Sequence, residues 1–110
     1  LGSVILRVWA LLHPRPGSEL DMALRNWHRA IATAYLASSK GRINRDFPGA
    51  CAELVRVLEF NTEGEAPDEQ RLTLIQGMCQ SQIATFERAA HAVAAARHRR
   101  ETPLPLPVTA

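Results

Sequence analysis

The chain has 110 residues, 46% of them hydrophobic and 22% charged, and a formal net charge of +2. These values predict one globular domain and exclude a disordered chain, which would combine lower hydrophobicity with higher net charge. Alanine is abundant and only 5% of the residues are aromatic, which favours helices over sheets.

The first predicted element is an apolar segment at residues 4–13, which Pro14 and Pro16 end. Its apolar residues recur with helical spacing, although a strand would also accommodate them. They are Val4, Ile5, Val8, Leu11 and Leu12. We predict a short helix, and we interpret residues 1–3 as a fragment end or a tag scar. The segment is too short for a membrane span, so we expect no membrane partner.

A second helix is predicted at residues 18–40. Ser18 is a good N-cap, and Asp21 three residues later completes a pattern similar to a capping box. Gly41 is a natural C-terminal stop. One apolar stripe contains Leu20, Leu24, Trp27, Ile31, Ala34 and Ser38.

A third helix is predicted to start at Asp46 and Pro48 and to run to Phe60. It is the most clearly amphipathic stretch of the chain, with charged residues opposite one apolar face. That face contains Phe47, Ala50, Cys51, Leu54, Val55 and Leu58. A polar loop follows at residues 61–66.

The last predicted helix begins after Pro67 and runs from Asp68 to about Arg100. Its core-facing stripe contains Leu72, Ile75, Cys79, Ile83, Phe86, Ala90 and Val93. We expect the proline-rich tail at residues 103–110 to be extended.

Together these elements predict an all-α fold: a small antiparallel bundle of three to four helices with a long C-terminal helix, forming a single domain over residues 1–110. At 1.5 Å per residue the last helix is about 48 Å long, against about 33 Å for the second helix. Its alanine-rich end at residues 89–100 should project past the other helices. Because an isolated helical extension is only marginally stable, we expect self-association, with a homodimer as the simplest form.

Cys51 and Cys79 lie on the apolar faces of two different helices. We interpret them as reduced core residues of a cytoplasmic protein, although a disulfide would be open to them if the two faces meet. His91 and His98 share a helix face, but nothing in the sequence supplies the further ligands of a metal site. We therefore predict neither a metal ion nor another cofactor.

Charge is unevenly distributed along the chain. Residues 22–45 and 88–100 contain only basic charges, whereas residues 59–69 contain only acidic ones. In an antiparallel bundle the end of the last helix should meet the turn after Gly41, so that two basic groups converge. Arginine suits phosphate because its planar fork donates two hydrogen bonds. The predicted phosphate-contacting residues are Arg42, Arg45, Arg88, Arg97, Arg99 and Arg100.

The sequence contains no Gly-rich phosphate loop and no nucleophile–base arrangement, so we do not expect an enzyme. The preferred hypothesis is a helical binding or regulatory protein that contacts the phosphate backbone of nucleic acid through its basic end. The alternative is a protein-interaction module, such as an adaptor, chaperone or regulatory subunit. Its working surface would be residues 4–12 or the alanine-rich end of the last helix.

Overall fold

The computed structural model describes residues 2–60 and 69–101, and all the regular structure in these ranges is helical. The helices are α1 (Gly2–Leu12), α2 (Glu19–Ser39), α3 (Phe47–Phe60) and α4 (Glu69–Glu101). The prediction of an all-helical fold with a long last helix is confirmed. The predicted polar loop, the predicted helix start at Pro67 and Asp68, and the proline-rich tail lie outside the described residues.

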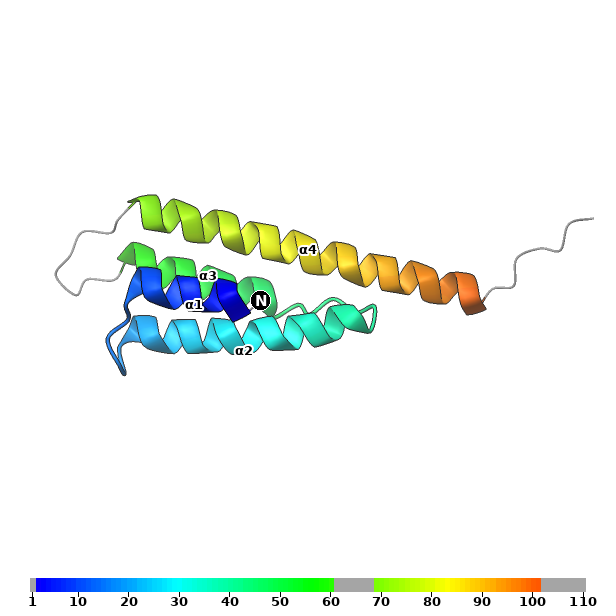
Figure 1. Ribbon diagram of the computed structural model, residues 1–110, viewed down its shortest axis with the longest axis horizontal. Coiled ribbons are helices and arrows are strands. Elements are labelled where there is room, and N and C mark those ends of the chain that lie inside the picture. Colours follow the sequence, from blue (N-terminus) through cyan, green and yellow to red (C-terminus); the bar gives the residue numbers. More distant parts are fainter. Residues whose placement is uncertain (1, 61–68, 102–110) are drawn as a thin grey trace, which may run out of the picture.

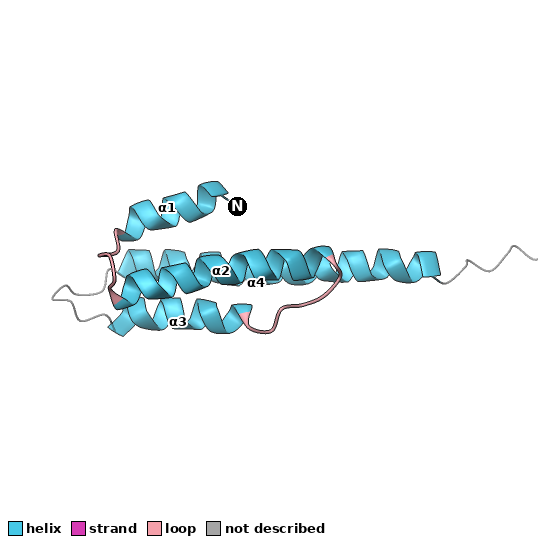
Figure 2. Ribbon diagram, turned by 90° about the horizontal axis from the view of Figure 1, so that it is seen from below, coloured by secondary structure: helices cyan, strands magenta, loops and turns pink. Residues whose placement is uncertain are grey.

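The helices α2, α3 and α4 pack directly on one another. In Figure 1, α2 runs from left to right, α3 returns beside it, and α4 runs from left to right again past the ends of both. Figure 2 shows α1 set apart on one side of this group. The first apolar segment is therefore a helix and not a strand, and it includes Gly2 and Ser3, which the sequence reasoning left out.

The start of α2 depends on two side chains that bind free backbone N–H groups. Ser18 Oγ accepts a hydrogen bond from the Asp21 N–H at 3.1 Å, as an N-cap does. Asp21 Oδ2 accepts from the Gly17 N–H at 3.0 Å, one residue earlier than in a capping box. The Gly17 N–H and the nearby Arg25 guanidinium hold the pKa of Asp21 below its usual value.

The end of α2 is a Schellman turn at the predicted stop. Gly41 has a φ of 75°, a left-handed conformation that glycine adopts without steric cost. The Gly41 N–H donates to the Ser38 carbonyl, and the Arg42 N–H donates to the Ala37 carbonyl. These bonds satisfy two carbonyl groups at the end of α2 and turn the chain toward α3.

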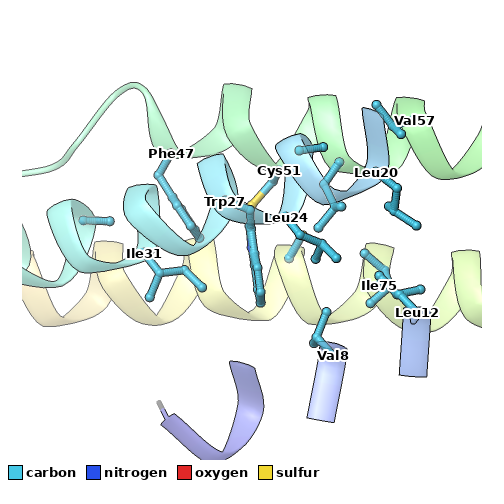
Figure 3. Close-up of a cluster of buried hydrophobic side chains, with 14 residues drawn as sticks. Val8, Leu12, Leu20, Leu24, Trp27, Ile31, Phe47, Cys51, Val57 and Ile75 are labelled. Carbon is cyan, nitrogen blue, oxygen red and sulfur yellow. The ribbon is translucent and has the colours of Figure 1, made fainter. Parts of the chain in front are cut away.

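The core is formed where α2, α3 and α4 meet, and Figure 3 shows its buried side chains. Its largest fully buried members are Trp27, Leu24, Ile31, Leu54, Ile75 and Val57. The predicted stripes supply all of these except Val57. Since α3 packs against both α2 and α4, its buried face is wider than the single stripe identified in the sequence.

One face of α1 joins this core. Val8 and Leu12 are buried, and the Trp9 ring meets the His28 ring of α2 edge-on at a centroid distance of 6.0 Å. The opposite side of α1 faces solvent, where Leu6 is 72% exposed. Thus α1 covers one side of α2 and α4, and Trp9 serves as a contact within the chain.

Candidate functional site

The turn after α2 lies directly against α4. An ideal Cβ placed on Gly41 would be 3.2 Å from the backbone nitrogen of Ala94 and 3.4 Å from Val93 Cγ1. The segment that carries Arg42 and Arg45 therefore leaves α2 beside the last three turns of α4. From the sequence we expected the end of the last helix to meet the turn after Gly41, and the contact of Gly41 with Ala94 lies at that turn.

Beyond that contact, the inward face of α4 changes from apolar to basic. Ala90 is buried and Val93 is half-buried. Arg97 follows Ala90 by seven residues, and Arg100 follows Val93 by seven, so each pair shares a side of the helix. Arg97 and Arg100 thus continue the core-facing stripe past the turn at Gly41, where both are exposed.

The other two arginines predicted on this helix lie elsewhere. At about 100° per residue, Arg88 and Arg99 lie roughly 160° and 180° around α4 from Ala90. Arg88 also precedes the contact at Ala94 by more than one turn. The contact at Gly41 therefore puts the start of the turn, which carries Arg42, beside the part of α4 where Arg97 and Arg100 share one side. Arg45 lies two residues before Phe47, whose ring contacts Phe86, so the chain has turned back along α4 by that point. Arg88 and Arg99 lie on the outer face of α4.

All six predicted arginines are exposed, and within the described residues none of them forms an ion pair. The ion pairs seen between residues of the described ranges are at the other end of α2 and on α3. They join Arg25 to Asp21, and Arg56 to both Glu19 and Glu53. Arg56 lowers the pKa of Glu53, and the two carboxylates raise the pKa of Arg56. The basic end thus keeps its hydrogen-bond donors available for an external anion.

The C-terminal end of α4 projects beyond α2 and α3 (Figure 1). Its surface is composed of small apolar and basic side chains, and Ala92 and Ala95 are exposed there. Tyr35 and Ile43, near the same end, are 52% and 47% exposed. This end of the molecule therefore combines cationic groups with uncovered apolar surface.

A second surface feature is an open groove between α1 and the first half of α4, with a volume of about 880 Å³. Most of its lining is aliphatic: Val4, Val8, Leu11, Leu74, Ile75 and Met78. Arg7 and Glu69 supply charged groups along it. Sequence reasoning missed this groove, because Leu74 lies off the core stripe of α4 and the position of α1 could not be deduced from its periodicity.

The described residues contain no group of three or more His, Cys, Asp or Glu side chains placed to share a metal ion. Every helix in the described ranges is too short or too polar to cross a membrane. Comparisons with known protein families, curated proteins and solved structures found no match.

Proposed function

We propose that this chain is a non-enzymatic, antiparallel helical bundle that binds the phosphate backbone of nucleic acid through its basic end. The observation that supports the proposal most strongly is the contact of Gly41 with Ala94. This contact supports the proposal because Arg42 directly follows Gly41, and Arg97 and Arg100 follow Ala94 by three and six residues.

The chemistry of this end suits phosphate recognition. Each guanidinium can donate two parallel hydrogen bonds to phosphate oxygens, and each contact releases counterions from the nucleic acid. Arg42 and Arg45 come from a turn and Arg97 and Arg100 from one side of α4, and the described part of the chain offers no base-reading element beside them. We therefore expect binding that depends on salt and depends little on sequence.

We further propose that the protein acts as a homodimer. Residues 95–101 of α4 extend beyond the contact with Gly41, and a helical end of this length gains little stability alone. Exposed small side chains such as Ala92 and Ala95 would allow close approach of a second copy. Dimerisation would also double the number of arginines presented to one nucleic acid.

A direct test is fluorescence anisotropy with labelled duplex DNA, single-stranded DNA and RNA, measured from low to physiological salt. The proposal predicts saturable binding whose affinity falls steeply as salt increases. Undetectable binding to all three probes at low salt would remove the proposal.

The groove between α1 and α4 supports a second candidate, a protein-interaction module. Its aliphatic walls and its position between two helices suit one amphipathic helix of a partner protein. Replacing Leu74 with Asp would abolish such binding and leave nucleic-acid affinity unchanged. An unchanged partner affinity in L74D would exclude the groove.

A further inference from the structure

The two cysteines of the chain meet in the core between α3 and α4. Phe47 and Phe86 set the register of these helices, because their rings contact edge-on with centroids 5.3 Å apart. Cys51 follows Phe47 by one helical turn, and Cys79 precedes Phe86 by two turns. Both cysteines belong to the same buried cluster, and each is 3% exposed.

Trp27 adds a polar group at the same place. Its ring is fully buried beside Cys51 (Figure 3), and its Nε1 has no hydrogen-bond partner in the described part of the chain. A buried indole N–H without an oxygen or nitrogen acceptor is unfavourable, and sulfur is a weak acceptor. The N–H is therefore available to the neighbouring sulfur.

The two sulfur atoms influence each other's protonation. The Cys51 thiol, acting as donor, lowers the pKa of Cys79. In return, Cys79 and burial raise the pKa of Cys51, which the Trp27 N–H only partly opposes. A thiolate is the reactive form of cysteine, so these directions favour Cys79 as the sulfur that attacks first and Cys51 as the resolving thiol.

We propose that Cys51 and Cys79 are a reversible disulfide pair, which a peroxide oxidises to a covalent link between α3 and α4. Cys79 loses its proton and attacks one peroxide oxygen, breaking the O–O bond and forming a sulfenic acid and water. The Cys51 sulfur then attacks the Cys79 sulfur and displaces its hydroxyl group, which leaves as water with the Cys51 proton. Two thiols and one hydrogen peroxide thus give one disulfide and two waters.

The small size of the oxidant matters because both sulfur atoms are buried. Hydrogen peroxide can enter during local opening of α3 from α4, whereas a bulky disulfide reagent requires more space. The disulfide joins the two ends of the segment between Cys51 and Cys79 into a covalent loop, which includes residues 61–68. A link of this kind stabilises the folded state mainly by restricting the unfolded chain.

The test treats the folded Trp9→Phe protein with hydrogen peroxide, because Trp27 is then its only tryptophan. We expect a product without any intermolecular disulfide that has lost two hydrogens and both alkylatable thiols. Trp27 fluorescence should fall at least about twofold through contact with the disulfide, and the Tm should rise by about 10 °C. Dithiothreitol should reverse all of these changes.

The matched variants are Cys51→Ala and Cys79→Ala in the same background, each checked for folding by its far-UV spectrum. Neither variant should show the rise in Tm or the loss of two hydrogens. Three results would overturn the proposal: a covalent dimer, oxygen addition to both thiols without hydrogen loss, or disulfide formation only in denaturant.

Discussion

Gly41 and Ala94 are in contact across the interface of α2 and α4. The position of a Gly41 Cβ lies 3.2 Å from the Ala94 nitrogen, closer than real Cβ contacts ordinarily come. The same glycine has the left-handed φ that the Schellman turn requires. Two independent constraints therefore favour glycine at the point where the basic turn meets the long helix.

Replacing Gly41 with Ala should destabilise the fold by about 2–3 kcal/mol, because the new Cβ is strained by φ and also crowds α4. Gly17→Ala is the matched control, since Gly17 has a φ of 77° but no atom within 4 Å of its Cβ position. The Gly17→Ala variant should lose only about 1–2 kcal/mol of its free energy of unfolding.

Gly77 lies inside α4 with open space around its Cβ position, so Gly77→Ala should stabilise the protein by about 1 kcal/mol. Urea unfolding of the three variants measures all these changes. Equal losses for Gly41→Ala and Gly17→Ala would show that the contact with Ala94 does not form.

Asp21 should make stability depend on pH. The pKa of Asp21 is lowered in the folded protein, so its stabilising effect is present at neutral pH. The stabilisation by Asp21 is lost as the pH falls below the usual carboxyl range and through the lowered pKa that Asp21 has in the folded protein. Asp21→Asn should therefore be less stable than the parent near pH 7, and the difference should shrink toward pH 2.

The control for that series is Glu59→Gln on α3, which removes one exposed negative charge without removing a cap. Thermal unfolding of both variants from pH 7 to pH 2 provides the measurement. A deficit of Asp21→Asn that stays constant over this range would contradict the role given to the carboxylate.

Two leucines on α2 test the position of the core. Leu24 is fully buried, whereas Leu36 is 58% exposed on the same helix. Leu24→Ala should lower the free energy of unfolding by about 2–5 kcal/mol, because it leaves a cavity in the core. Leu36→Ala leaves no cavity and should change it by no more than about 0.5 kcal/mol. Comparable losses in urea unfolding would show that Leu36 is covered in solution, as it would be in a dimer.

Much of this fold was predictable from local patterns. Ser18 and Gly41 marked the ends of α2 because capping and left-handed turns depend on a few neighbouring residues. The stripe from Ile75 to Val93 was predictable for a similar reason, since helical periodicity determines which side chains share a face.

The rest depends on contacts between helices that are distant in sequence. The burial of Val57 and the groove beside Leu74 depend on how α3 and α1 pack, which periodicity alone does not specify. For the candidate site, the contact of the turn at Gly41 with α4 was predictable from helix lengths and connections, whereas a shared binding surface of the six arginines stays a prediction. The helical period places Arg88 and Arg99 on the opposite side of α4 from Ala90. The prediction of six phosphate-contacting arginines grouped them by their position along the chain and did not use that period.

Self-association through the end of α4 can be tested with Ala95→Glu. If two copies pack there, a buried carboxylate should weaken the dimer at least about tenfold in sedimentation equilibrium. Gln80→Glu, an exposed change in the same helix, serves as control and should leave the dimer intact. A monomeric parent protein at high concentration would contradict the dimer.

The most direct test of the central claim compares how salt affects nucleic-acid binding by two triple variants of equal charge. Arg42, Arg97 and Arg100 are changed to Gln in one, and Arg7, Arg15 and Arg29 in the other. We predict that the first variant weakens duplex binding and lowers the slope of log K against log salt by about 2.7, at roughly 0.9 per lost phosphate contact. The second should bind like the parent, and equal losses in both variants would contradict the claim that the basic end is the binding surface.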